Sequence, residues 1–486
     1  MHNSLRSDHI SGKYAARTMS VIEKAKALRF RLPFRFWVPG LYWDTWKLLE
    51  QSEAWSRARL LEYQTDLLRQ NLIHCGRNVP YYRRLFREYG FEPQSVREPS
   101  DIRKLPPLDR EQLLENPADF LAENISHEQR AYHATGGTMG RPLGLYNLRD
   151  AGWRERAFVN TLWRRVGFGW GDRRAMLKGT VIKSSRHWEY DPIERAWTFS
   201  NFHMTPRNVA EYARVMKRKG ALYFHTYPSA ALDFARHLRD GQIEPPRFRA
   251  ILAASENLYP GQRELLENFF HCRVFSFYGH SENTVMAGEC EVSTNYHIFP
   301  EYGLTEIIGD DGRPVSREGE SGEIVGTSFY NRVMPLVRYR TGDFAVLGPE
   351  SCACGRPYPL LKQVLGRWHQ EMLIGKQGNL VSITALNFHS SIFAQVHQFQ
   401  LHQAEKGRVQ VRLVRKNGYT EEDTRRIAAA LAEKMGDSME VEFTFPDSIA
   451  VTPRGKYRYI VQELELPRLA PGAEGTEKKL EPIAGS

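Results

Sequence analysis

The sequence lacks long apolar runs and holds few cysteines. No stretch of the 486 residues reaches the ~18–20 consecutive apolar positions of a membrane-spanning helix. The first residues contain no apolar segment of the kind that a secretory signal requires. Five cysteines in a chain of this length do not read as a disulfide framework. We therefore expect a cytoplasmic globular protein.

The net charge is +10, yet concentrated basic runs are scarce. Scattered Lys and Arg residues without base-stacking motifs argue against nucleic acid as the partner. They favour an anion such as a nucleotide or CoA. The exception is segment 24–37, which mixes basic and large apolar side chains. It could dock on a membrane surface or pack as a strap on the main domain, and Pro33, which interrupts a helix, favours the strap.

Periodicity divides the chain into two α/β units. Apolar spacing predicts an amphipathic helix from Leu48 to about Ile73. Strand-like segments 221–226, 248–254 and 273–278 alternate with helical segments, which is typical of a parallel sheet with crossover connections. In the C-terminal part, strand-like segments 408–414 and 439–445 flank a helix that opens near Thr420 with a capping box.

These patterns predict an α/β fold with a large N-terminal domain and a small C-terminal α+β domain. The expected divisions are an N-terminal extension at 1–47, the large domain at 48–366, the small domain at 367–466 and a disordered tail at 467–486. Parallel sheets bind ligands at the carboxyl ends of their strands. The ends of the three predicted strands carry segments rich in polar groups, which are therefore site candidates: Thr226, Ser255, Glu256, Asn257, Tyr278, Gly279, His280, Ser281 and Glu282.

A glycine-rich segment begins at Ala134 and reads ATGGTMGRPL. It lies between strand-like stretches and predicts a hairpin loop whose backbone N–H groups approach an anion. It does not fit the Walker A pattern, and taken alone such a loop is more often a tight turn. Downstream, a turn after the strand-like stretch from Val337 presents Asp343, although a single Asp there is usually a turn former. Lys456, between turn residues and a strand, is by default a solvated charge.

The segment Tyr278-Gly-His-Ser-Glu282 places a carboxylate and a hydroxyl at a strand end, which suits Mg²⁺ or nucleotide binding. The alternative is a nucleophile elbow around Ser281. That motif requires glycine at position 283, where the chain has Asn283, so a hydrolase is disfavoured.

The order of the motifs is more informative than any one of them. ATGGTMGRP, SEN, YGHSE, RYRTGD, GRWHQEMLIGKQG and PRGKYRYI, in that order, resemble the core motifs of the adenylate-forming superfamily. Within it, the chain is most similar to phenylacetate–CoA ligases and to their relatives associated with capsular polysaccharide biosynthesis. The resemblance implies that ATP activates a carboxylic acid, for which aryl and arylacetic acids are candidates, to an acyl-adenylate with release of pyrophosphate.

The resemblance also implies roles for individual residues. The ATP phosphates would be held by the glycine-rich loop, through Thr135, Gly136, Gly137 and Thr138. Ser255 and Glu256 would lie along the adenine and Tyr278 would stack near it. Ser281 would contact phosphate, Glu282 would help to hold Mg²⁺, Asp343 would bind the ribose, and Arg367 would lie near the nucleotide and the domain boundary. Lys456 would bridge the carboxylate and the α-phosphate, and the small domain would then rotate to admit the acyl acceptor.

The acceptor stays open in the sequence. CoA is one candidate, and an amine or hydroxyl of a sugar or amino acid is the other, because the stretch after Gly366 departs from degradative CoA ligases. A catalytically inactive nucleotide-binding interaction protein is a further alternative, which the joint presence of Glu282, Asp343 and Lys456 disfavours. The sequence leaves a homodimer open. Residues expected around the acid are Phe202, His225, Tyr227, Ala254 and Asn283.

The cysteines form two groups. Cys290, His297, Cys352 and Cys354 could complete a tetrahedral zinc site, although C-x-C is tighter than the usual spacing and buried free thiols are the alternative. The phenylacetate–CoA ligase resemblance implies a similar Cys/His set and therefore favours zinc. Cys75 and Cys272 are expected to be core thiols.

Overall fold

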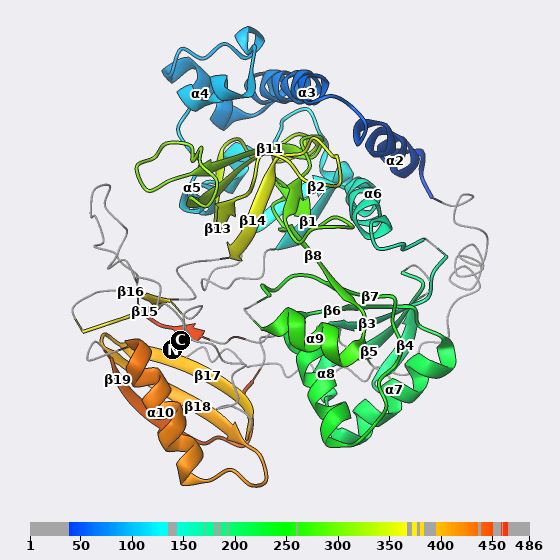
Figure 1. Cartoon of the computed structure of the whole chain (residues 1–486). Helices are drawn as coiled ribbons and strands as arrows, with labels where there is room; N and C mark the ends of the chain where they lie inside the picture. Colours follow the sequence, from blue (N-terminus) through cyan, green and yellow to red (C-terminus); the bar gives the residue numbers. More distant parts are fainter. Residues whose placement is uncertain are drawn as a thin grey trace, which may run out of the picture.

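A computed structural model (Figure 1) describes residues 38–134, 143–169, 171–178, 182, 186–191, 194–258, 261–366, 372–376, 380–382, 395–435, 439–450, 458 and 460–464. Segment 24–37, the glycine-rich loop at 135–142 and the predicted tail at 467–486 lie outside these residues, as do Arg367 and Lys456.

The described α-helices are α2 (Gly40–Ser52), α3 (Arg57–Asn78), α4 (Pro80–Glu88), α5 (Arg110–Glu115), α6 (Ala151–Arg164), α7 (Pro206–Lys219), α8 (Pro228–Asp240), α9 (Gln262–Phe270) and α10 (Glu421–Met435). Short 3-10 helices are η2 (Pro93–Ser95), η3 (Pro99–Lys104), η4 (Pro117–Phe120), η5 (His127–Gln129) and η6 (Asn201–His203).

The first ten strands are β1 (Arg130–Ala134), β2 (Gly144–Leu148), β3 (Arg174–Lys178), β4 (Trp188–Asp191), β5 (Ala196–Ser200), β6 (Tyr223–Thr226), β7 (Ala250–Ala253), β8 (Arg273–Gly279), β9 (Met286–Gly288) and β10 (Tyr296–Ile298). The others are β11 (Gly303–Ile308), β12 (Ser321–Ser328), β13 (Tyr339–Leu347), β14 (Leu360–Gly366), β15 (Met372–Ile374), β16 (Leu380–Ser382), β17 (Val396–Glu405), β18 (Arg408–Arg415), β19 (Glu440–Thr444) and β20 (Ile460–Gln462).

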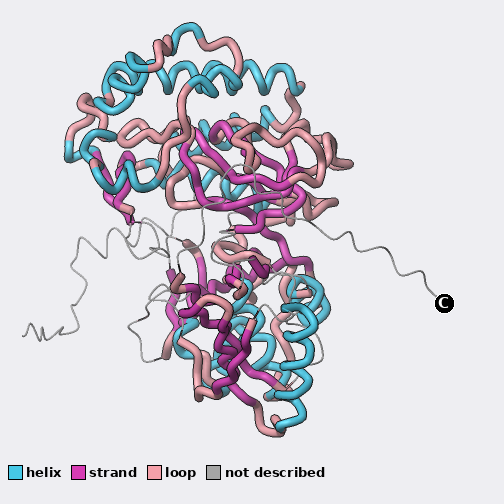
Figure 2. Tube along the Cα trace, turned by 90° about the vertical axis from the view of Figure 1, so that its left-hand side faces the viewer, coloured by secondary structure: helices cyan, strands magenta, loops and turns pink. Residues whose placement is uncertain are grey.

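The N-terminal helices lie along the upper edge of the molecule in Figures 1 and 2. The single helix predicted from Leu48 to Ile73 is wrong in extent, because the structure has two helices, α2 and α3, across that range. The break occurs at Ser56, whose backbone is extended and whose hydroxyl accepts a hydrogen bond from the N–H of Arg59 at 3.3 Å. Ser56 is thus an N-cap that starts a new helix. Apolar spacing continues on both sides of the break and so conceals it.

The predicted parallel sheet is confirmed. Strands β5, β3, β6, β7 and β8 lie side by side and parallel, within a 12-stranded sheet of order β11-β12-β13-β14-β10-β9-β8-β7-β6-β3-β5-β4. Strand β8 is also antiparallel to β9, so it joins the parallel part to the antiparallel part. Polar residues at the end of β8 are therefore close to strands from both parts.

Helices cover both faces of the parallel part. On one face, α7, α8 and α9 pack through residues such as Tyr212, Phe234 and Phe270. On the other, Phe158, Leu162 and Trp163 of α6 pack on alternate strand residues, which include Tyr223, Leu252 and Phe275. This alternation follows from the two-residue period of a strand. It leaves the carboxyl ends of the strands as the place where side chains from several elements meet.

The small C-terminal domain has its own sheet, of order β19-β18-β17-β20, and its own apolar cluster with Ile427 and Leu431 of α10. The capping box predicted at its helix is confirmed. The N–H of Thr420 donates to Asp423 Oδ2 at 2.9 Å, and the N–H of Asp423 donates to Thr420 Oγ1 at 3.4 Å. The predicted α/β fold with a small C-terminal domain is therefore present.

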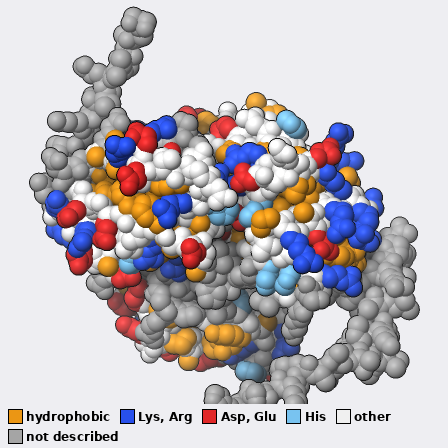
Figure 3. Space-filling model, turned by 90° about the horizontal axis from the view of Figure 1, so that it is seen from below, with side chains coloured by type: hydrophobic (Ala, Val, Ile, Leu, Met, Phe, Trp, Pro, Cys, Tyr) orange, Lys and Arg blue, Asp and Glu red, His pale blue; other side chains and the backbone are white. Residues whose placement is uncertain are grey.

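Charge on the surface is unevenly spread. On the face seen from below, Lys and Arg side chains gather towards one side (Figure 3).

Across the described part of the chain, none of the helices is both long and apolar enough to cross a membrane.

Candidate active site

The loop after β7 carries Ser255, Glu256 and Asn257. Ser255 has φ of 68°, a left-handed conformation that non-glycine residues seldom adopt. The backbone N–H of Ser229, in the first turn of α8, donates to Glu256 Oε2 at 3.1 Å. Helix N-termini stabilise carboxylates, so Glu256 fixes this loop against α8.

Asn257 fixes the other side of the same loop. Its Nδ2 donates to the carbonyl of Leu365, at the end of β14, at 3.0 Å. The next residue, Gly366, has φ of 66°, and a Cβ at this position would collide with the Asn257 side chain. The loop is therefore held directly against the last described residue before the predicted domain boundary.

Tyr278 and Asp343 are brought together from two distant strands. The Tyr278 hydroxyl donates to Asp343 Oδ2 at 2.7 Å. Burial, and then the Asp343 carboxylate, raise the pKa of Tyr278 well above its ordinary value, which keeps the hydroxyl protonated as a donor. The prediction that a turn presents Asp343 is wrong, because the residue lies inside β13. Gly342, with φ of 72°, and register shifts on both sides make the strand irregular there, and this irregularity sets the direction of the carboxylate.

Glu282 is 5% exposed and is held from two sides. Its carboxylate lies 3.0 Å from His280 Nδ1 and accepts a hydrogen bond from the Tyr339 hydroxyl at 3.3 Å. A carboxylate only accepts hydrogen bonds, so Nδ1 carries the imidazole proton and Nε2 faces the Thr284 hydroxyl at 3.1 Å. The Glu282 side chain is thus held in place just beyond the carboxyl end of β8.

The β1–β2 hairpin reaches this same place. His133, in β1, lies with its Nε2 3.0 Å from the backbone carbonyl of the exposed Ser281. The hairpin is antiparallel from Arg130–Leu148 to Ala134–Gly144, as predicted, and it carries the glycine-rich loop at its tip. The loop therefore starts two residues after a direct contact with the YGHSE segment.

Glu155 of α6 forms a partly buried polar group with Tyr302 and with Asn283, the residue after Glu282. The Tyr302 hydroxyl donates to Glu155 Oε2 at 2.6 Å, and Asn283 Nδ2 lies 3.0 Å from the Tyr302 oxygen. Burial raises the pKa of Glu155, while hydrogen bonding to Tyr302 opposes the shift. Asn283 has φ of 54°, another rare conformation at this strand end.

His225 and Lys178 form a second polar pair beneath α6. Lys178 is the last residue of β3, and its Nζ lies 3.1 Å from Nε2 of His225 on β6. His225 is 8% exposed, its ring packs edge-on against Trp163, and its Nδ1 has no hydrogen-bond partner among the described residues. Burial, and then Lys178, lower the pKa of His225 well below its ordinary value, so the ring is neutral.

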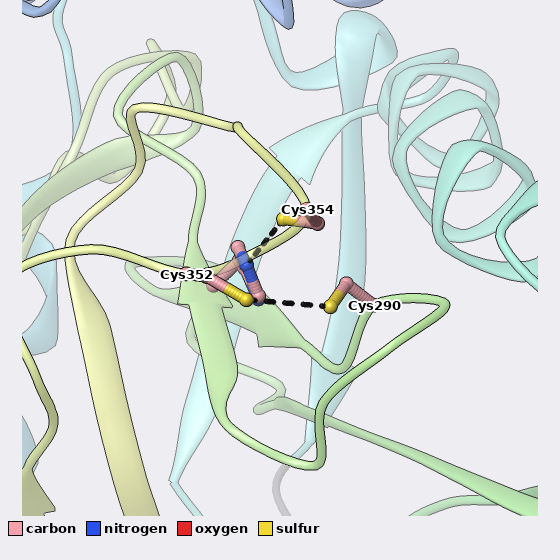
Figure 4. Close-up of side chains that lie close together, drawn as sticks. Cys290, Cys352 and Cys354 are labelled. Atoms are coloured by element: carbon pink, nitrogen blue, oxygen red, sulfur yellow. Dashed lines mark hydrogen bonds between the residues drawn. The ribbon is translucent and has the colours of Figure 1, made fainter.

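The four predicted zinc ligands meet in space. Figure 4 shows the sulfurs of Cys290, Cys352 and Cys354 directed towards a common centre, and all four candidate ligand atoms lie within 4.8 Å of one another. Cys290 Sγ lies 3.7 Å from Cys352 Sγ, and His297 Nε2 lies 3.2 Å from Cys354 Sγ. Two sulfurs bound to one tetrahedral zinc are separated by roughly 3.8 Å, so the donor set fits zinc. His297 Nδ1 faces the Asn295 carbonyl at 3.2 Å, which leaves Nε2 for a metal.

The remaining two cysteines lie outside the Cys/His cluster, as expected. Cys75 is fully buried in an apolar cluster, and Cys272 packs partly buried against another.

The structure thus brings together the described members of the predicted nucleotide site, which are Ser255, Glu256, Tyr278, Ser281, Glu282 and Asp343. Among the residues predicted around the acid, His225 and Asn283 lie on the α6 side of the sheet; Tyr227 and Ala254 are buried, and the Phe202 side chain lies outside the described residues. Sequence reasoning missed His133, Glu155 and Lys178. Of these, Lys178 alone had a usable signal, as a polar residue ending a strand-like segment.

Comparison with solved structures defines the class of fold. A 2-hydroxyisobutyryl-CoA ligase, solved in the postadenylation state in complex with R3-HIB-AMP, aligns with a TM-score of 0.66 at 20% identity, over 82% of this chain and 89% of that one. The chain has the fold of adenylate-forming CoA ligases.

Sequence comparison identifies particular relatives. Phenylacetate-coenzyme A ligase of Thermus thermophilus is 26% identical over 337 residues, which cover 66% of this chain and 73% of the relative. Protein CapK of Staphylococcus aureus is 21% identical over 423 residues, which cover 84% and 90%. Residues 373–463 match the family described as the CapK C-terminal domain. The homologues of this chain are therefore phenylacetate-coenzyme A ligases and CapK, and the resemblance predicted from the motifs is confirmed.

Proposed function

We propose that the chain uses ATP to convert a carboxylic acid to an acyl-adenylate, with release of pyrophosphate, and then transfers the acyl group to CoA. The observation that carries this proposal is the convergence of Glu256, Tyr278 and Glu282, at the carboxyl ends of β7 and β8, with Asp343 of β13, which the Tyr278 hydroxyl contacts. Homology to phenylacetate-coenzyme A ligases supports CoA as the acceptor.

The nucleotide would lie across these strand ends. Asp343, oriented by Tyr278, would accept hydrogen bonds from the ribose hydroxyls, and the loop of Ser255 and Glu256 would lie along the adenine. Thr135, Gly136, Gly137, Thr138 and Ser281 would surround the phosphates. The His133–Ser281 contact supports this assignment because it holds the base of the glycine-rich hairpin against the YGHSE segment.

Charge neutralisation is the main chemical demand of the first step. A carboxylate that attacks the α-phosphorus brings two anions together, so cations must offset the repulsion. Lys456 of the small domain would supply one, with Arg367 close to the nucleotide. The buried Glu282 carboxylate fits one oxygen ligand of Mg²⁺, which commonly takes one or two carboxylates together with phosphate oxygens and water. When bound, Mg²⁺ would supply further neutralisation of the phosphates.

The acid would lie between the sheet and α6. This side holds two polar pairs, Glu155 with Asn283 and Lys178 with His225, in otherwise apolar surroundings. Lys178 donates, and the buried Nδ1 of His225 has no partner among the residues that the structure describes. We infer an acid that carries an oxygen function, such as a hydroxyl, oxo or second carboxyl group, away from the reacting carboxylate. An acid that lacks this oxygen function would leave the buried polar groups unpaired and would therefore bind less tightly.

The Cys/His cluster would hold a structural zinc ion. All four positions are protein ligands, and a closed site of this kind stabilises a fold and leaves no position for substrate.

The small domain, which we place between the boundary at 366/367 and residue 466, would rotate between adenylation and acyl transfer. Transfer to an amine or hydroxyl is the second candidate for the acceptor, because the stretch after Gly366 departs from degradative CoA ligases.

A panel of acids scored by pyrophosphate release tests the proposal. Release should require an acid, rise on addition of CoA, and be stronger for hydroxy, oxo and dicarboxylic acids than for phenylacetate. A matched pair of variants, His225→Ala and His127→Ala, separates the acid site from the exposed surface. His225→Ala should lower kcat/KM for the best acid about 10–100-fold without changing KM for ATP. Acid-independent ATP turnover, or none with any acid, would overturn the proposal.

A further inference from the structure

A second cluster of metal-ligating side chains lies between the two domains. Asp233 and His237 are four residues apart on α8 and therefore share one face of that helix. His397 approaches them from β17 of the small domain. The three candidate ligand atoms, one carboxylate oxygen and two imidazole nitrogens, lie within 4.8 Å of one another. Neither the nucleotide site nor the Cys/His cluster includes any of these residues.

The distances in this cluster are too long for direct hydrogen bonds and slightly longer than those between two ligands of one metal ion. His237 Nε2 lies 3.9 Å from Asp233 Oδ1, and His397 Nε2 lies 4.0 Å from the same oxygen. Both separations exceed a hydrogen bond. Asp233 Oδ1 is buried and has no hydrogen-bond partner within the described residues. Two nitrogen or oxygen ligands at about 2.0–2.2 Å from one zinc ion are roughly 3.3–3.6 Å apart, so small side-chain rotations would bring all three to one ion.

We propose that Asp233, His237 and His397 form a zinc site that joins the large domain to the small domain. Two imidazoles and one carboxylate suit zinc, and water would complete a tetrahedron. Two ligands from one helical turn, spaced i and i+4, form a preformed half of the site. The third ligand arrives with the small domain, so an ion binds fully only when β17 lies against α8.

The surrounding charges set the strength of this site. Arg236 Nη1 lies 3.7 Å from Asp233 Oδ1, and its side chain is 27% exposed, so a bound ion would displace it towards solvent. Lys416 of the small domain also acts electrostatically on His397. Both cations oppose a divalent ion. The site is therefore weaker than the thiolate cluster and responds to the free zinc concentration.

Helix α8 links this site to the nucleotide loop. Its first turn donates a hydrogen bond to Glu256, and its later turns carry Asp233 and His237. The consequence for catalysis rests on the proposed function. Zinc that holds β17 against α8 retains the small domain in this orientation. It slows transfer to the acceptor, which needs rotation of the small domain.

Zinc binding to the purified full-length chain is the direct test. In buffered free zinc, the chain should bind a second equivalent beyond the one in the Cys/His cluster. His397→Ala and His237→Ala should each weaken this second binding by more than the ~10–100-fold that loss of a supporting group costs. His402→Ala is the matched control, because His402 lies on the same strand β17 but contacts Glu463. This variant should still bind two equivalents of zinc.

Arg236→Gln makes the test sharper. Removing this cation should tighten the second site several-fold, whereas an ordinary ion-pair network would gain no metal affinity. Co²⁺ bound there should absorb without the thiolate-to-metal band that the Cys/His cluster produces. Absence of a second equivalent in both the wild type and Arg236→Gln, or its persistence in His397→Ala, would overturn the proposal. These readouts do not use catalysis, so they stand apart from failure of the proposed function; zinc should additionally slow CoA-dependent turnover in the wild type but not in His397→Ala.

Discussion

Tyr278 and Asp343, 65 positions apart in the sequence, share a hydrogen bond of 2.7 Å that joins β8 to β13. It connects the parallel part of the large sheet to the antiparallel part at the proposed ribose position. The Tyr278 hydroxyl therefore orients the Asp343 carboxylate.

Tyr278→Phe removes this hydrogen bond and keeps the ring. We expect KM for ATP to rise about 10-fold, since hydrogen bonds to charged groups contribute roughly 1.5–3 kcal/mol and water replaces part of the loss. KM for the acid should stay constant. Initial-rate kinetics with each substrate varied would measure both values, and an equal rise in both would assign Tyr278 to general folding.

Lys456→Ala should leave ATP binding in place and abolish carboxylate-dependent pyrophosphate exchange, because the variant lacks the cation that offsets repulsion between the carboxylate and the α-phosphate. Exchange of labelled pyrophosphate into ATP is the measurement. Lys406→Ala, an exposed lysine of the same domain, is the control. Near-normal exchange in Lys456→Ala would remove the role proposed for this residue.

Cys352→Ser should remove the structural zinc and lower the thermal midpoint by several degrees, since a closed zinc site contributes directly to folding. Metal analysis should find one zinc fewer per chain than in the wild type. Cys272→Ser, outside the cluster, should retain the metal. A metal-free wild type that is folded and active would exclude the site.

The buried His225 should make the free energy of unfolding depend on pH. Because burial lowers its pKa below 6.5 in the folded chain, the unfolded chain binds the extra proton, and stability falls as the pH drops below about 6.5. One such proton contributes a slope of up to about 1.4 kcal/mol per pH unit. His225→Gln should reduce the slope measured by denaturant unfolding at pH 5 to 7, whereas the exposed His127→Gln should not; equal slopes in both variants would contradict the assignment.

The sequence predicted those features that local patterns encode. Strand periodicity located β6, β7 and β8, and ordered motifs brought Glu282 and Asp343 into one candidate site. Local patterns did not reveal the Ser56 break, because apolar spacing runs through it, or the place of Asp343 inside a bulged strand. Pairings such as Glu155 with Tyr302, 147 positions apart, and Asp233 with His397 arise from tertiary packing alone.

The contact between Asn257 and Gly366 constrains how this chain can be recombined. The nucleotide loop and the exit from β14 fit each other only when position 366 has no side chain and position 257 can donate to Leu365. A chimera that exchanges the C-terminal domain for that of another ligase should therefore be joined after Gly366. A junction placed earlier would put a foreign residue against the loop that is proposed to hold the adenine, and we expect it to couple acceptor engineering to a loss of ATP affinity.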